Sequence, residues 1–248
     1  MTASADHIHT SLEAVAKIRA LRKGNPDLMA ANAAIKRFQA RRFEATYPDL
    51  LQSRRYQPAA RFFLYELYSD KDYAQRDQQF ARIANTISKL FPQSVVDTAA
   101  ALAQVHALTE QLDDAMAHAY LALPPATQNH SGAARYIASW RQVASPAARQ
   151  QQLDVVLALG QSLDRLTRKP GLRLLLKMMR GPAAAAGLGS LQTFLESGFD
   201  TFQTMRGADE FLKLIAEREA DWIERLFNED AVACETKLLE LLARSAVG

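Results

Sequence analysis

Acidic, arginine and tyrosine side chains are concentrated between residues 61 and 83, where the chain reads RFFLYELYSDKDYAQRDQQFARI. An arginine guanidinium can hold an anionic group through two hydrogen bonds, and a tyrosine hydroxyl can donate a further one. The combination predicts a pocket for a small apolar or anionic ligand, with no catalytic residue assigned. The residues of this candidate ligand site are Tyr65, Tyr68, Asp72, Arg76, Asp77 and Arg82.

The same segment also has a structural interpretation. Its first half is almost wholly apolar and aromatic, so it predicts a largely enclosed helix whose tyrosine hydroxyls need partners. The acids and arginines that follow can supply those partners and join two helices as a polar clamp. Ion-pair networks of this kind are frequent structural elements, so both interpretations stand.

Acidic residues on the longest expected helix raise the question of a metal site. Asp114 and His118 are four residues apart and could share an ion with Glu110 nearby. A di-metal helical bundle also needs Glu-x-x-His motifs, and the sequence contains none. A solvated charged helix face is the preferred interpretation, and neither a metal nor another cofactor is expected.

Basic residues gather near the N-terminal quarter of the chain and alternate with aromatic ones. Nucleic-acid surfaces combine these residue types, but arginine stems also commonly cover apolar helix surface while their heads stay in water. The formal net charge is only +3, so we do not expect a nucleic-acid partner. The basic residues are Lys36, Arg37, Arg41, Arg42, Arg54 and Arg55.

The elements that would position these side chains are all helices. Apolar residues recur at three-to-four spacing, as at Leu12, Val15 and Ile18, while glycine and proline fall between the periodic segments. The pattern predicts an all-α bundle of eight to ten helices without a sheet, forming a single domain over residues 1–248. The aromatic helix and a long helix over 94–123 should lie at its centre, and the polar segment 124–132 could divide two layers.

Composition limits where the protein works. The single cysteine, Cys234, excludes an internal disulfide, and the N-terminal residues lack the basic and apolar segments of a secretory signal. Charged residues interrupt the stretch 171–202, so it should not span a membrane. We therefore expect a cytoplasmic protein with no membrane partner.

Two longer stretches carry a family resemblance. YPDLLQSRRYQPAARFFLYELYSDKDYAQRD and MMRGPAAAAGLGSLQTFLESGFDTFQTMRGADEFLKLIAERE resemble a family of uncharacterised bacterial proteins with an FFLxxLYxxxDxxxRD segment. The resemblance covers most of the chain and implies a bacterial all-α protein. It implies no reaction, cofactor or functional residue.

The sequence leaves three classes of function open. A non-enzymatic helical scaffold or regulatory protein acting through protein contacts is the first hypothesis, because no catalytic constellation is recognisable. A binding module for a small apolar or anionic ligand is the second, and an unrecognised, possibly metal-dependent enzyme is the third. An internal cavity with converging polar groups would favour the second over the first. A homodimer through residues 172–179 or the C-terminal LLELLARSAV is also expected.

Overall fold

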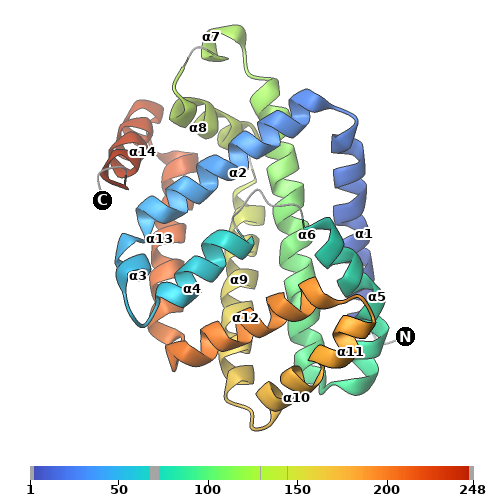
Figure 1. The fold of residues 1–248 in the computed structure, drawn as a ribbon. Helices are drawn as coiled ribbons and strands as arrows, with labels where there is room; N and C mark the ends of the chain where they lie inside the picture. The colour runs from blue at the N-terminus through green and yellow to red at the C-terminus, as the bar shows by residue number, and fades with distance from the viewer. Residues whose placement is uncertain (1–2, 68–72, 129, 144, 246–248) are drawn as a thin grey trace.

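The fold is entirely helical in the part of the chain that the structure, a computed structural model, describes: residues 3–67, 73–128, 130–143 and 145–245 (Figure 1). The elements are α1 (Ala3–Lys23), α2 (Pro26–Thr46), α3 (Pro48–Gln52), α4 (Gln57–Phe62), the π-helix η1 (Phe63–Leu67), α5 (Ala74–Leu90), α6 (Gln93–Leu121), α7 (Pro125–Gln128), α8 (Gly132–Val143), α9 (Pro146–Thr167), α10 (Leu172–Met178), α11 (Arg180–Ala185), α12 (Gly189–Met205), α13 (Asp209–Asn228) and α14 (Ala231–Ser245).

The all-α prediction is confirmed, but the predicted number of eight to ten helices was too low. Several segments that the sequence did not predict as separate helices form helices of one or two turns, among them α3, α7 and α11. Proline at the first position favours such short helices, because its fixed φ suits the helix and its missing amide proton leaves no donor unpaired there. Pro48 and Pro125 begin α3 and α7 in this way.

Helix α6 is the long helix that the sequence predicts, and it runs through the middle of the molecule (Figure 1). It packs against α1, α2, α8 and α9, so helices from both halves of the chain meet along it. One of its faces carries His106, Glu110 and Asp113 at helical spacing. The central position of α6 therefore places charged residues inside the protein.

The aromatic segment differs from the single enclosed helix that we expected. Helix α4 ends at Phe62, and the chain continues as the π-helix η1, in which hydrogen bonds span five residues. Phe62, Phe63 and Leu64 are buried, whereas Tyr65 is 51% exposed. Part of the segment therefore lies at the surface.

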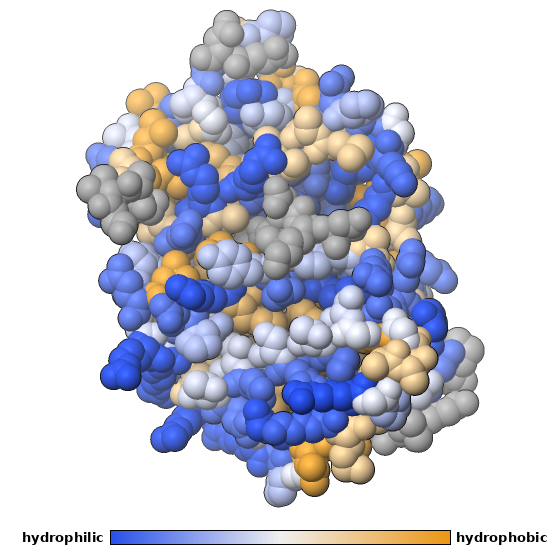
Figure 2. Space-filling view, in the orientation of Figure 1, coloured by the Kyte–Doolittle hydropathy of each residue, from blue (hydrophilic) through white to orange (hydrophobic). Residues whose placement is uncertain are grey.

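The face of the molecule seen in Figure 2 is mostly hydrophilic, with hydrophobic side chains at the end where α10 lies. Leu174 and Met178, four residues apart on α10, are 62% and 66% exposed. The homodimer expected through this region stays a prediction. Within the described residues, no helix combines the length and the hydropathy that crossing a lipid bilayer requires.

Candidate ligand-binding site

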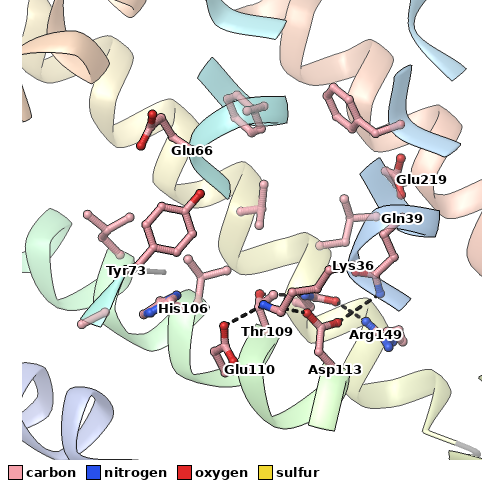
Figure 3. Close-up of a pocket in the computed structure, with 18 of the residues that line it drawn as sticks. Lys36, Gln39, Glu66, Tyr73, His106, Thr109, Glu110, Asp113, Arg149 and Glu219 are labelled. Carbon is pink, nitrogen blue, oxygen red and sulfur yellow. Dashed lines mark hydrogen bonds and ion pairs between the residues drawn. The ribbon is translucent and has the colours of Figure 1, made fainter. Parts of the chain in front are cut away.

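A cavity of about 110 Å³ lies between α2, α6, α8, α9 and α13, with α5 and η1 at its other end (Figure 3). Its wall contains both charged and apolar side chains. Figure 3 shows polar groups from several helices converging on this space. They include Lys36, Gln39, Glu66, His106, Glu110, Asp113, Arg149 and Glu219. We call it the polar cavity.

Helix α2 contributes a lysine that contacts two acids of α6. The Lys36 ammonium lies 2.7 Å from a Glu110 oxygen and 3.3 Å from an Asp113 oxygen. Gln39, one turn further along α2, donates a hydrogen bond of 3.1 Å to Asp113. Two consecutive turns of α2 therefore fix two acids of α6 through side-chain contacts.

Glu110 is held ionised by the cations around it. Burial alone would raise its pKa, but the Lys36 ammonium, followed by Arg19, lowers the pKa to about 2. Arg22 adds an ion pair at 3.3 Å. For Lys36 the effects are reversed: burial lowers its pKa, but Asp113 and Glu110 raise it by more, so the pKa of Lys36 is raised overall. Glu110 and Lys36 are therefore both charged at neutral pH.

A second ion pair joins α2 to α13. The Arg42 guanidinium donates two hydrogen bonds to the Glu219 carboxylate, at 3.2 and 2.6 Å. The Tyr47 hydroxyl donates a third, at 2.9 Å. All three residues are buried, and paired charges are the form in which a protein interior tolerates ions.

Two residues of α8, Tyr136 and Trp140, also line the polar cavity, and each carries a hydrogen-bond donor: the Tyr136 hydroxyl and the Trp140 indole nitrogen. The residues are four positions apart, so they share one face of α8. Tyr136 is 1% exposed and Trp140 is 5% exposed. Neither polar atom has a hydrogen-bond partner within the described part of the chain. We call the Tyr136 hydroxyl and the Trp140 indole nitrogen the two donors. The Arg149 guanidinium lies over the Trp140 ring, 4.1 Å from its centroid.

The other end of the polar cavity contains two of the residues predicted from sequence. Asp77 accepts a hydrogen bond from Arg19 at 2.7 Å and contacts His106 Nε2 at 2.8 Å. Burial raises the pKa of Asp77, and the His106 contact together with the arginines lowers it overall. Arg76 stacks on Tyr73 and lies 3.6 Å from an Asp77 oxygen. The structure thus brings Arg76 and Asp77 into one wall.

The remaining residues of the predicted site have other locations. Tyr65 is exposed on η1, where its carbonyl accepts a hydrogen bond from the Tyr73 hydroxyl. Arg82 is exposed on α5 and donates to the Ala186 carbonyl, and it is not among the residues that line the polar cavity. Tyr68 and Asp72 lie outside the described residues.

The residues weighed as a metal site and as a basic surface are largely engaged in ion pairs. Asp114 contacts Arg22 at 3.1 Å and His118 at 3.6 Å, and His118 is exposed. The described residues contain no cluster of three or more acidic, histidine or cysteine side chains arranged to hold a metal. Lys36 and Arg42 belong to the interior pairs above, so they do not contribute to a basic surface.

The residues at the α8 end of the polar cavity were not predicted from the sequence, although one of them, Glu219, has a recognisable sequence pattern around it. Five buried residues of α13 follow alternating spacings of three and four. Four of them are apolar and the middle one is an acid, so a charge within an apolar stripe predicts a buried cation nearby. The stripe consists of Leu212, Ile215, Glu219, Trp222 and Leu226.

Fold and site together define an all-helical protein with a polar internal cavity of a size and lining suited to part of a small molecule. A family model described as a domain of unknown function (DUF8198) matches residues 18–233, so the chain belongs to that family. Comparison with the curated proteins and with the solved structures found no match.

Proposed function

We propose that this protein is a ligand-binding module and not a pure scaffold, and that it binds a small organic molecule in the polar cavity. The observation that carries the proposal is the pair of donors on α8, which find no acceptor among the described residues. A buried donor without an acceptor costs about 1–3 kcal/mol. A ligand oxygen between Tyr136 and Trp140 would recover that cost.

The surrounding residues are suited to orient such a molecule. Arg149 donates to Gln152 at 3.0 Å, and Gln152 donates to Thr109 at 2.8 Å, so α9 and α6 are linked beside the two donors. Because these groups are fixed by other contacts, a ligand would meet a preorganised wall and little side-chain entropy would be lost on binding.

The direct test is native mass spectrometry of the purified protein, compared with its denatured mass. We expect an additional mass below about 500 Da that is lost on denaturation, in keeping with a drug-sized ligand in an internal cavity. Tyr136→Phe should reduce the occupied fraction, whereas Tyr56→Phe should leave it unchanged, because neither Tyr56 nor Glu210, which accepts its hydrogen bond, lines the cavity. Equal occupancy in wild type and Tyr136→Phe would contradict the proposed role of the two donors.

A further inference from the structure

An apolar cavity of about 220 Å³ adjoins the polar cavity. It lies between α5, α6, α9 and α12, and α10 and α11 close it at one end. The two cavities share part of their walls, including Phe63, Val105, Val156 and Phe194. They are therefore neighbouring cavities, and the residues that they share are apolar.

The apolar cavity makes few hydrogen-bonding demands on an occupant. Its wall is formed almost wholly by aliphatic and aromatic side chains. Thr98 and Gln192 already donate to backbone carbonyls of Ser94 and Leu176, at 2.7 Å in both cases. An engineered apolar cavity of about 150 Å³ stays dry and accepts benzene, so a space of this size and lining suits a hydrocarbon group.

The charges beside the two donors indicate whether the head of a ligand should be charged. Arg42 and Arg149 act on the Tyr136 hydroxyl together with Asp113 and Glu219. Lys36 and Glu110, which pair with each other in the same wall, add one charge of each sign, so the cations and acids here are equal in number. An anionic head would upset this balance inside the protein, where an unpaired charge is costly. An uncharged oxygen can accept from both donors at no such cost.

Resting on the proposed function, we infer that the ligand is amphipathic, with an uncharged oxygen-bearing head at the two donors and a hydrocarbon chain in the apolar cavity. Because the two cavities share part of their walls, one molecule of sufficient length would occupy both. This assigns a chemical class, an alcohol, carbonyl compound or ester with a medium-length chain. It differs from the anionic ligand that the arginines of the 61–83 segment suggested.

The test is a calorimetric titration. Any retained molecule is first removed from the whole protein, which is then titrated with straight-chain primary alcohols from butanol to decanol. Affinity should rise about fourfold per methylene until the apolar cavity is full. Octanoate should bind at least about tenfold more weakly than octanol, since its carboxylate adds an unpaired charge. Tyr136→Phe should weaken octanol binding about three- to tenfold.

Two adjacent alanines of α11 give a matched pair of variants. Ala183 is buried and lines the apolar cavity, whereas Ala184 is exposed. Ala183→Phe should shorten the longest alcohol that still gains affinity, and Ala184→Phe should not. Thermal unfolding of both variants confirms that they are folded before titration.

Several results would overturn the inference. Affinity independent of chain length, equal limits in both alanine variants, or tighter binding of octanoate than of octanol each contradict it. If a retained molecule still depends on Tyr136 while the alcohols fail to bind, the proposed function stands and the amphipathic assignment falls. If neither a retained molecule nor an alcohol binds, both fall.

Discussion

At the scale of single residues, Tyr47 and Tyr136 are a natural comparison, because both are fully buried tyrosines in the same interior. The Tyr47 hydroxyl donates to Glu219 at 2.9 Å. The Tyr136 hydroxyl is without an acceptor in the segments that the structure describes, and burial raises the pKa of this phenol, so it stays protonated. The same chemical group thus contributes to stability at one position and lowers it at the other.

We expect Tyr136→Phe to leave the free energy of unfolding of the ligand-free protein unchanged, or to raise it by about 1 kcal/mol. The substitution removes a buried polar atom while keeping the ring stacked on Phe38. Tyr47→Phe should lower it by about 1–3 kcal/mol, because Glu219 loses a donor. Urea unfolding of the two variants measures both effects, and a large loss in Tyr136→Phe would mean that its hydroxyl has a partner.

At the scale of elements, the crossing of α9 and α13 depends on a glycine. A Cβ atom at Gly160 would lie 2.5 Å from a Leu212 methyl group, and Leu212 is buried in the core. A side chain at this position would therefore force Leu212 to shift within the packed core. Gly181 on α11 is different, since a Cβ atom there would meet no neighbour within 4 Å among the described residues.

Gly160→Ala should lower the free energy of unfolding by about 1–2 kcal/mol, because overpacking outweighs the gain of about 1 kcal/mol in helix propensity. Gly181→Ala should instead leave stability unchanged or raise it slightly. Adding Leu212→Ala to Gly160→Ala should cost less than the sum of the two single losses, since the overlap is relieved. Additive losses in denaturant unfolding would contradict the packing argument.

The elements were predictable from sequence to the extent that their causes are local. Proline at the start of α2 and α9, and the unbroken periodicity of α6, mark these helices without reference to the rest of the chain. The π-helix η1 was not predictable, because its sequence is an ordinary helical one. Tyr136, Trp140 and Arg149 were missed for a related reason: only the packing of separate helices places them in the same cavity wall as Glu219 and Asp113.

At the scale of the whole molecule, the interior ion pairs connect residues far apart in the sequence. Glu110 on α6 contacts Arg22 of α1 and Lys36 of α2, and Glu219 connects α2 to α13. While such a pair is complete, the mutual attraction offsets the cost of burying its charges, but losing one partner leaves a buried charge alone. The molecule should therefore respond to acid through these pairs.

The pKa of Glu110 is about 2 in the folded protein, against 4.5 as the ordinary value. Its stabilising contribution, on the order of 3 kcal/mol, is thus complete above about pH 4.5 and lost as the pH falls toward 2. Arg19, Arg22, Lys36 and His106 are the facing groups. Wild-type stability should exceed that of Glu110→Gln at pH 7, and the difference should shrink in acid.

Urea unfolding between pH 7 and pH 2.5 checks this expectation. Glu240→Gln provides the control, because Glu240 is an exposed acid on α14. Its stability should follow the wild type at every pH. A constant difference between wild type and Glu110→Gln across the range would contradict the assigned pKa shift.

The short helix α10 has a kinetic consequence for any molecule held behind it. Leu172 and Leu176 form part of the apolar wall, yet no residue within Leu172–Met178 is fully buried. Few buried contacts mean a low free energy of local opening. Backbone amides of α10 should therefore exchange with deuterium faster than those of α6, and a bound ligand should slow them. The residence time of the ligand would then be set by how often α10 detaches and opens an exit. Equal deuterium exchange rates in α6 and α10 would exclude an exit at α10.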